Sequence, residues 1–298
     1  MDEQRLVNSH FEKAASHWAE VYEREDDLTA LMYQQRLSSM VRLLEQISLP
    51  RQERVLEVGC GAGHAAVALA KLGYFVDALD AVQVMVDATH DRAVKANLEH
   101  LVRSQVGDVN ALCFPDETFG LVLALGVLPW LPSMEKAMRE MCRVLRPGGY
   151  LIISVGNRWG LSRFVDPFAN ASLRPVRQLV KRIFSRGKLP LKPWWRLMSI
   201  GEWDALLAAN QLDKLDGITF GFGPFTFFGY QLLPHSVGVG VYRALTVWAD
   251  RGVPVLRSAG NLYTVLGKKR GSAAHGAPMA PACGGVARRV KRGDSVKD

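Results

Sequence analysis

The chain has 298 residues, of which 48% are hydrophobic and 22% are charged. This composition is typical of a folded globular protein and excludes a largely disordered one. The 37 Lys and Arg residues exceed the 29 Asp and Glu residues, which gives a net charge of +8. A chain of this length buries enough apolar surface to fold without disulfides or metals, as one elaborated domain or two small ones.

The cysteines, Cys60, Cys113, Cys142 and Cys283, lie far apart and form no CxxC pair. This spacing indicates neither a metal site nor a redox dithiol. The N-terminus is polar, with no apolar signal region behind it, and no apolar run reaches the roughly 18 residues that a membrane span needs. The sequence therefore predicts a cytoplasmic protein.

Alternating strands and helices are predicted between Arg54 and Val155. Before them, residues 1–50 carry two helical stripes of apolar side chains. We then expect strands at 55–58, 75–80, 102–107, 119–125 and 150–155, and helices at 65–72, 82–95 and 134–145. Strands that are apolar almost throughout and alternate with helices predict a parallel sheet that is covered on both faces.

The C-terminal half departs from this alternation. Residues 157–200 contain ten Lys and Arg residues and one acid. A capping box at Ser199 and Glu202 predicts a helix at 203–209, and a strand at 215–222, a helix at 235–250 and a strand at 261–267 follow. Residues 269–298 are rich in Gly, Ala and Pro without periodicity, which predicts a disordered basic tail.

A glycine-rich loop follows the first strand, in the sequence Val55-Leu56-Glu57-Val58-Gly59-Cys60-Gly61-Ala62-Gly63. Glycine lets the backbone approach a ligand closely and adopt positive φ, and ligands of doubly wound sheets bind beyond the strand ends. Asp80 ends the next strand, where its carboxylate could accept hydrogen bonds from both hydroxyls of an adenosine ribose. The loop and this acid predict a nucleotide-type ligand.

Two ligands fit such a loop. The dinucleotide fingerprint is G-x-G-x-x-G, but here the sixth position is His64, whose imidazole suits a pyrophosphate poorly. A nicotinamide-dependent oxidoreductase therefore remains the alternative. The pattern E-x-G-x-G-x-G instead resembles that of class I S-adenosylmethionine-dependent methyltransferases.

The resemblance to this methyltransferase family, and to its quinone-biosynthesis-like small-molecule members, continues through residues 54–155. The stretch from Asp80 to Met85 resembles the second motif, Gly107-Asp108-Val109 the third, and R-V-L-R-P-G-G-Y-L from Arg143 the late turn. Gly120 replaces the usual Asp before strand four, and Pro129-Trp130 stands where many relatives have Glu-His.

This resemblance implies an α/β, Rossmann-like doubly wound sheet of seven strands in the order 3-2-1-4-5-7-6, with strand 7 antiparallel. It also implies one domain over 1–268, with cap helices in 1–50 and a helical insertion at 157–200 after strand 5.

S-adenosylmethionine is the cofactor that the resemblance implies, with no metal. The implied cofactor-binding residues are Glu57, Gly59, Cys60, Gly61, Gly63, Asp80, Ala81, Met85, Asp108, Val109 and Leu125. Cys60 is expected to face the amino-acid part of the cofactor rather than act as a nucleophile. Arg36 could bind the cofactor carboxylate, but a solvated side chain is the favoured interpretation.

Methyl transfer to a small-molecule or lipid-linked acceptor is the predicted activity, and an apolar or aromatic acceptor with O-methylation is favoured. A neutral oxygen acceptor needs a base, and the sequence indicates none; the candidates are His10, His17 and His235, because His64 and His90 are expected on helices of the core. Trp130 is expected to form an apolar wall of the acceptor pocket. A non-catalytic, membrane-associated module that binds S-adenosylmethionine is the second alternative.

Residues 175–196 combine an apolar helical face with basic neighbours. A lid helix over the site is favoured over a helix in an anionic membrane interface; the latter would place the protein peripherally at the inner face of the membrane. The aromatic residues of 220–230 are interpreted either as core strand and turn or as acceptor-pocket lining. Since no RNA-binding motif occurs, nucleic acid is not an expected partner.

Overall fold

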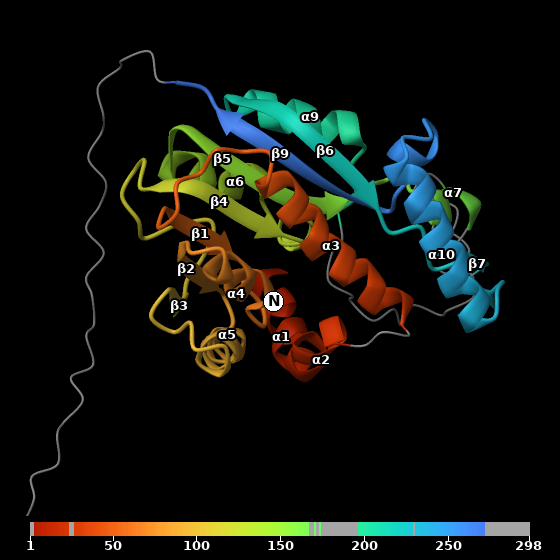
Figure 1. Ribbon diagram of the computed structural model, residues 1–298, viewed down its shortest axis with the longest axis horizontal. Helices are drawn as coiled ribbons and strands as arrows, with labels where there is room; N and C mark the ends of the chain where they lie inside the picture. The colour runs from red at the N-terminus through yellow and green to blue at the C-terminus, as the bar shows by residue number, and fades with distance from the viewer. Residues whose placement is uncertain are drawn as a thin grey trace, which may run out of the picture.

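The computed structural model describes residues 3–23, 27–166, 170, 173, 196–228 and 230–271, without the side chains of residues 3, 16, 17, 19 and 23 (Figure 1). The described helices are α1 (Glu3–Lys13), α2 (Ala15–Glu20), η1 (Val21–Glu23), α3 (Leu28–Leu44), α4 (His64–Lys71), α5 (Gln83–Lys95), η2 (Leu128–Trp130), α6 (Met134–Val144), α7 (Leu161–Val165), α9 (Ile200–Ala209), α10 (His235–Asp250) and η4 (Leu256–Ser258). The strands are β1 (Arg54–Val58), β2 (Phe75–Asp80), β3 (Val102–Val106), β4 (Phe119–Leu125), β5 (Leu145–Gly156), β6 (Leu212–Phe220), β7 (Thr226–Phe227), β8 (Tyr230–Gln231) and β9 (Leu262–Lys269).

Seven strands form one sheet in the order β3-β2-β1-β4-β5-β9-β6. Neighbours from β3 to β5 pair in parallel, whereas β9 runs antiparallel to both β5 and β6. The predicted doubly wound sheet, with its late antiparallel strand beside strand 5, is therefore confirmed. The sheet ends later in sequence than expected, because β9 continues to Lys269.

Each face of the sheet is covered by its own apolar core. Side chains of α3, α4 and α5 pack on one face, and side chains of α6 and α9 pack on the other (Figure 1). Val122 and Leu123 of β4 point into opposite cores and are both fully buried. The near-continuous apolar strands thus reflect burial on both faces.

The capping box predicted before α9 is present. Ser199 Oγ accepts a hydrogen bond from the Glu202 backbone N–H at 3.2 Å, and a Glu202 carboxylate oxygen accepts one from the Ser199 N–H at 2.6 Å. Trp203 then packs into the core, fully buried, and its indole N–H donates to the Gly156 carbonyl. The cap starts the helix three residues earlier than the apolar pattern indicated.

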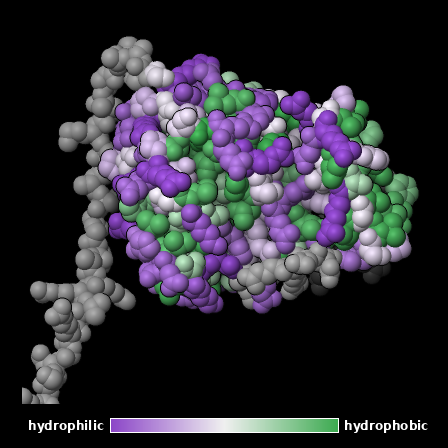
Figure 2. Space-filling view, in the orientation of Figure 1, coloured by the Kyte–Doolittle hydropathy of each residue, from purple (hydrophilic) through white to green (hydrophobic). Residues whose placement is uncertain are grey.

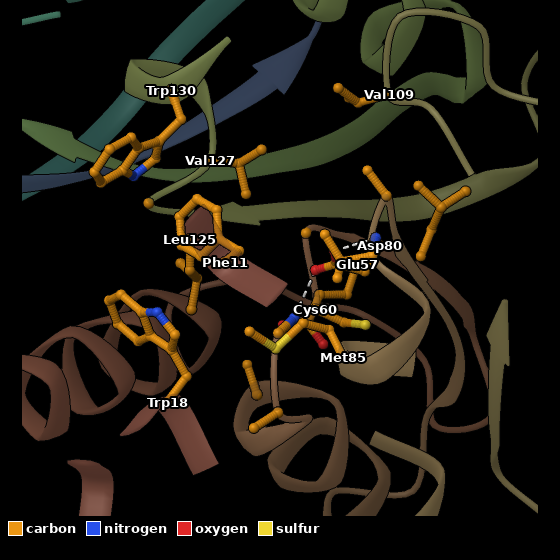
Figure 3. A pocket seen from close by; sticks show the side chains of 18 of the residues that line it. Phe11, Trp18, Glu57, Cys60, Asp80, Met85, Val109, Leu125, Val127 and Trp130 are labelled. Atoms are coloured by element: carbon orange, nitrogen blue, oxygen red, sulfur yellow. Dashed lines mark hydrogen bonds between the residues drawn. The ribbon is translucent and has the colours of Figure 1, made fainter. Parts of the chain in front are cut away.

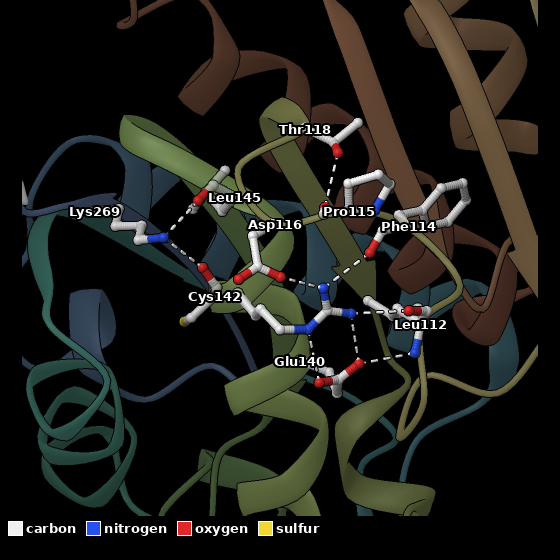
Figure 4. A network of polar contacts seen from close by, with 10 residues as sticks. Leu112, Phe114, Pro115, Asp116, Thr118, Glu140, Cys142, Leu145 and Lys269 are labelled. Atoms are coloured by element: carbon white, nitrogen blue, oxygen red, sulfur yellow. Dashed lines mark hydrogen bonds and ion pairs between the residues drawn. The ribbon is translucent and has the colours of Figure 1, made fainter. Parts of the chain in front are cut away.

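A polar network around Arg143 of α6 fixes the loop that leads into β4 (Figure 4). The guanidinium donates to the backbone carbonyls of Leu112 and Phe114, both at 2.8 Å, and to the Asp116 carboxylate at 2.7 Å. Glu140 binds the same guanidinium and accepts from the Leu112 N–H at 2.9 Å. The partly buried side chains of Glu140 and Arg143, near the C-terminal end of α6, therefore hold the chain that follows Val109.

Gly120 lies where the family pattern usually has Asp. A Cβ at this position would lie 2.7 Å from carbons of the Glu53 side chain. Glu53 itself forms an ion pair with Arg146 at 2.8 Å. Glycine at position 120 therefore leaves room for the ion pair between Glu53 and Arg146 at the start of β4.

The aromatic stretch at 220–230 divides in two. Phe220 and Phe222 are buried in the core and Phe225 is partly buried, whereas Phe227, Phe228 and Tyr230 are exposed on the small hairpin β7–β8. None of them is among the residues that line the pocket described below. Of the two predicted interpretations, core strand and turn is the observed one.

Most of the predicted 175–196 helix and nearly all of the predicted 269–298 tail lie outside the described residues. Within the described part, no helix is both long and apolar enough to cross a membrane.

Candidate functional site

A large pocket opens at the C-terminal ends of β1, β2 and β4, between the sheet and the N-terminal helices. Its empty volume is about 1140 Å³, including space that is open to solvent. Figure 3 shows two groups of side chains facing each other across it: Glu57, Cys60, Asp80 and Met85 on the sheet side, and aromatic residues of the helices opposite. The position is the one expected for the ligand of a doubly wound sheet.

The glycine loop makes a tight turn into α4. Gly59, Gly61 and Gly63 have φ values of +66°, +53° and +77°, a region that favours glycine. A Cβ at Gly59 would lie 2.3 Å from Val127, and one at Gly63 would lie 2.8 Å from the backbone of Thr89. A Cβ at Gly61 would meet nothing within 4 Å, so this glycine leaves open space within the pocket.

Asp80 anchors the loop. One carboxylate oxygen accepts a hydrogen bond from the Gly61 N–H and the other accepts one from the Val82 N–H, both at 3.0 Å. Burial raises the pKa of Asp80, although these backbone donors oppose the shift. The predicted ribose acid therefore lies in the pocket and also holds the glycine loop.

Two residues of α5 that the sequence reasoning missed tie down the same loop. The Thr89 hydroxyl donates to the Gly61 carbonyl at 2.9 Å, and Arg92 Nε donates to the Ala62 carbonyl at 2.8 Å. Both carbonyls come from the loop's turn, so the loop is held in place by α5. The spacing from the loop to Thr89 carries no motif that could have revealed this.

Glu57 lies beneath the loop and is 3% exposed. Its Oε2 has no hydrogen-bond partner among the described residues. Burial, and to a smaller extent the charge of Asp80, raises the pKa of Glu57 well above its usual range. Burial likewise raises the pKa of the Cys60 thiol well above its usual value, which disfavours a nucleophilic thiolate.

The expectation that Arg36 is solvated is wrong. Arg36 is only 5% exposed and lines the pocket. Its guanidinium lies 4.7 Å from the ring centre of Tyr33, and its Nε has no hydrogen-bond partner among the described residues. The adjacent space is provided by Gly126, which sequence periodicity along α3 could not reveal.

Ten of the eleven predicted cofactor residues line the pocket: Glu57, Gly59, Cys60, Gly61, Asp80, Ala81, Met85, Asp108, Val109 and Leu125. Gly63 instead lies outside the lining, where its small size lets α4 approach α5. Asp108 is exposed and one of its oxygens accepts hydrogen bonds from the Asn110 backbone N–H and side chain, at 2.8 and 2.9 Å.

Aromatic residues from five helical segments, α1, α2, η1, α3 and η2, form the opposite wall. The rings of Phe11 and Trp130 meet edge to face with centres 5.2 Å apart, and Phe11 lies 5.8 Å from Trp18. Tyr22 and Tyr33 continue this wall toward Arg36. Trp130 lies in the pocket wall, as predicted, and the cap helices supply most of the other aromatic rings.

The histidines are placed differently from the expectation. His64 is not among the candidate bases that the sequence indicates, but it lines the pocket and stacks on Tyr22 with ring centres 4.0 Å apart. His10 stacks on Trp130 but is not among the lining residues, and neither is His235 at the start of α10. The His17 side chain lies outside the described part of the chain.

Comparison with protein families matches residues 56–153 to a model described as "Methyltransferase domain". The chain is 32% identical over 129 residues to the 27-O-demethylrifamycin SV methyltransferase of Amycolatopsis mediterranei. This alignment covers 43% of this chain and 47% of that protein. It is 29% identical over 187 residues to a ubiquinone/menaquinone biosynthesis C-methyltransferase of Nitrobacter hamburgensis, covering 60% and 72%. For three curated relatives at or above 30% identity, the aligned share of their own length is 41–59%, so the chain spans about half of them.

Among solved structures, the magnesium protoporphyrin IX methyltransferase of Synechocystis PCC 6803 matches with a TM-score of 0.57 at 15% identity, covering 89% of this chain and 99% of that one. At this identity the match concerns the fold. The family match lies on the β1–β5 core, and it includes the glycine loop and Asp80. Residues 56–153 thus match a methyltransferase domain, and the loop motif and the strand order around them are those of the class I S-adenosylmethionine-dependent methyltransferase fold.

Proposed function

We propose that the protein transfers a methyl group from S-adenosylmethionine to a small, apolar or aromatic acceptor. The observation that carries this proposal is the single pocket that joins the glycine loop and Asp80 to the aromatic wall of Phe11, Trp18 and Trp130. A donor and an acceptor can therefore lie side by side. Holding two reactants in line can lower the barrier of such a reaction by about 7–11 kcal/mol.

The pocket residues fit the cofactor. Glu57 Oε2 and Arg36 Nε are both buried without a partner among the described residues, and they belong to an acidic and a basic side chain. A zwitterionic amino-acid group supplies an ammonium donor for the first and a carboxylate acceptor for the second. Buried polar atoms are nearly always paired in native proteins, so these two atoms indicate a polar ligand.

The remaining cofactor contacts follow the strand order. Asp80 ends β2 beside the loop, and we assign it to the ribose hydroxyls; Met85 and Val109, which are buried in the lining, we assign to the adenine ring. We assign the exposed Asp108 carboxylate to the adenine amino group. When bound, the cofactor supplies an activated sulfonium methyl group.

The aromatic wall favours an apolar acceptor. Phe11, Trp18 and Trp130 present ring faces and edges to the pocket, which suits a flat or extended hydrocarbon better than a highly charged molecule. For transfer to a neutral hydroxyl, we propose His64 as the group that takes up the proton, because it is the histidine among the described residues that lines the pocket.

Calorimetric titration with S-adenosylmethionine and with NAD tests the cofactor assignment. We expect binding of S-adenosylmethionine, because His64 occupies the position where a dinucleotide-binding loop needs glycine. Binding of NAD without S-adenosylmethionine would instead support the oxidoreductase alternative.

A second experiment tests catalysis. Incubation with S-adenosylmethionine and a metabolite or lipid extract is expected to yield S-adenosylhomocysteine and a product heavier by one methylene group, both detected by mass spectrometry. Failure to form S-adenosylhomocysteine with any extract would support a non-catalytic cofactor-binding module. The Trp130→Ala variant should lower the rate while leaving S-adenosylmethionine binding unchanged, because Trp130 lies on the acceptor side.

A further inference from the structure

Two amide side chains lie on the otherwise aromatic wall of the pocket. The helix α1 presents four residues to the pocket, which are Gln4, Val7, Asn8 and Phe11. They follow one another at three- and four-residue spacing, so they share one face of the helix. Val7 is buried and Phe11 contacts Trp130, as an apolar wall requires. Gln4 and Asn8 occupy the same face although both are polar.

The solvent side of α1 is that of an ordinary surface helix. Arg5, His10, Glu12 and Lys13 are all exposed. Where hydrophobic residues gather on the visible surface, they do so at the end of the molecule with α10, α7 and β7 (Figure 2). A helix that only closed an apolar pocket would carry apolar residues on its inner face. The two amides on that face therefore need a reason.

The two amides bind each other. Gln4 Nε2 donates a hydrogen bond to Asn8 Oδ1 at 2.8 Å, across one turn of the helix. This bond engages the Asn8 oxygen and fixes the direction in which the Asn8 amide faces. No described residue accepts a hydrogen bond from Asn8 Nδ2. The Asn8 amide is therefore a hydrogen-bond donor that α1 offers to a molecule in the pocket.

Asn8 belongs to the acceptor side of the pocket. It precedes Phe11 by three residues, and side chains at this spacing on a helix are neighbours, with Cβ atoms about 5–6 Å apart. The ring of Phe11 in turn meets that of Trp130. Glu57 and Asp80, which we assign to the cofactor, lie across the pocket on the sheet side (Figure 3). A donor on α1 therefore faces the acceptor rather than the cofactor.

We propose that Asn8 determines specificity by binding a carbonyl oxygen of the acceptor, so that the acceptor is an apolar ring system that carries a ketone or a similar carbonyl group. This inference rests on the proposed methyl transfer and narrows its acceptor class. A carbonyl oxygen only accepts hydrogen bonds, and Asn8 Nδ2 only donates them. A hydroxyl would bring a proton that needs its own acceptor, and the Asn8 oxygen is already engaged by Gln4.

Gln4 is the positioning residue of this contact. Its bond holds the Asn8 amide in place before the acceptor arrives, which reduces the cost of ordering the side chain on binding. One fixed donor on an apolar wall sets the orientation of the bound molecule. A site built in this way discriminates against an analogue that lacks the carbonyl, because the donor is then left unpaired.

Equilibrium dialysis of the full chain, saturated with S-adenosylhomocysteine, tests the proposal with two probes. Acetylnaphthalene and ethylnaphthalene share the same ring and nearly the same shape, but only the first has a carbonyl oxygen. The preference is the ratio of their two dissociation constants, which cancels general changes in the shape of the pocket. In Asn8→Leu the preference for acetylnaphthalene should fall by about threefold to tenfold, the equivalent of one hydrogen bond.

Two further variants complete the test. Gln4→Leu should lower the same preference by less, because Asn8 keeps its donor but loses its fixed orientation. Arg5→Leu is the matched control, since it places the same new side chain on the exposed side of α1 and should leave the preference unchanged. An Asn8→Leu variant that keeps the parent's preference would overturn the proposal. So would a larger effect of Asn8→Leu on the binding of naphthylethanol, because the donor would then serve a hydroxyl.

Failure of this inference can be told apart from failure of the proposed function. Calorimetric titration should show that all three variants bind S-adenosylhomocysteine like the parent protein. Weaker binding in Asn8→Leu but not in Arg5→Leu would assign Asn8 to the cofactor and overturn the proposal. If the parent protein binds both probes with a preference that does not depend on Asn8, the apolar acceptor stands and only the carbonyl is lost. If it binds S-adenosylhomocysteine but neither probe, the apolar acceptor fails, and this inference fails with it.

Discussion

The guanidinium group of Arg36 occupies the space that a side chain at Gly126 would need. A Cβ at position 126 would lie 2.6 Å from Arg36 Nη1, and Gly126 has a φ of +75°. Gly126 comes directly after β4, whereas Arg36 comes from the middle of α3. The absence of one side chain thus lets the N-terminal helices deliver a buried positive charge to the sheet's ligand pocket.

Replacing Gly126 with alanine should displace this charge. We expect Gly126→Ala to weaken S-adenosylmethionine binding by roughly tenfold and to lower the free energy of unfolding by about 1–2 kcal/mol, because the clash adds to the strain of a positive φ. Calorimetric titration and urea denaturation measure the two effects. Gly73→Ala is the control, since Gly73 has a φ of +90° but nothing within 4 Å of its Cβ position; it should lose stability without losing affinity. If both variants lose affinity equally, Arg36 has no special role.

Glu57 should strengthen cofactor binding but lower the stability of the cofactor-free protein at neutral pH. Its pKa in the folded state is raised by burial, so the folded protein binds this proton more tightly than the unfolded chain does. Stability from this group is therefore greatest at low pH and decreases as the pH rises above the carboxyl's ordinary value. Glu57→Gln should raise the melting temperature at neutral pH, by about 2–4 °C for each 1 kcal/mol relieved, and should flatten its dependence on pH.

The same variant should bind S-adenosylmethionine more weakly, because the amide no longer attracts an ammonium group. Scanning calorimetry at several pH values, with and without cofactor, measures both changes. Glu99→Gln, at an exposed position, should leave both quantities unchanged. A melting temperature lower than that of the parent protein at neutral pH would contradict this account of Glu57.

Asp80 should contribute to binding through its charge and through the loop. We expect Asp80→Asn to weaken S-adenosylmethionine binding by about 1–3 kcal/mol, since an amide has one acceptor oxygen where the carboxylate uses both. Equilibrium titration measures the change. Asp87→Asn, on the exposed side of α5, serves as the comparison. Unchanged affinity in Asp80→Asn would remove Asp80 from the site.

Arg143 should matter for stability beyond an ordinary surface ion pair. Arg143→Met would leave the Leu112 and Phe114 carbonyls without their donor, so we expect a loss of about 2–3 kcal/mol in the free energy of unfolding. Arg42→Met removes the exposed ion pair to Asp250 and should change stability by less than about 1 kcal/mol. Chemical denaturation measures the free energy of unfolding of both variants. Equal decreases in the two variants would show that the Arg143 network stabilises the protein no more than an exposed ion pair does.

The sheet and the cofactor side of the pocket could be predicted because their signals are local. Glu57, the glycines and Asp80 lie within 24 residues of sequence, and each strand carries its own apolar run. Arg36 could not be placed in this way, because its burial depends on a glycine 90 residues later. His64 could not be recognised as a pocket residue, because helix periodicity alone does not show that the first turn of α4 faces the pocket.

The aromatic stretch at 220–230 shows a second limit of pattern reasoning. Phe220 and Phe222 are buried, yet Phe227 and Phe228 are exposed on a hairpin five to eight residues later. All four residues are phenylalanines, and only the turn after Phe222 separates the buried pair from the exposed pair. Composition therefore indicates that aromatic side chains gather there but not which of them the core accepts.

The position of β9 between β5 and β6 has a consequence for biosynthesis. Residues 262–269 fill the gap between β5 and β6, so β6 has no neighbour in the sheet, and β5 has only β4, until the ribosome has made these residues. The five strands from β3 to β5 can pair earlier, which leaves the β5 edge open during translation. An open strand edge is a site for pairing with other chains. The nascent protein should therefore depend on chaperones late in its synthesis, and ribosome-bound chains that stop before residue 262 should aggregate on release.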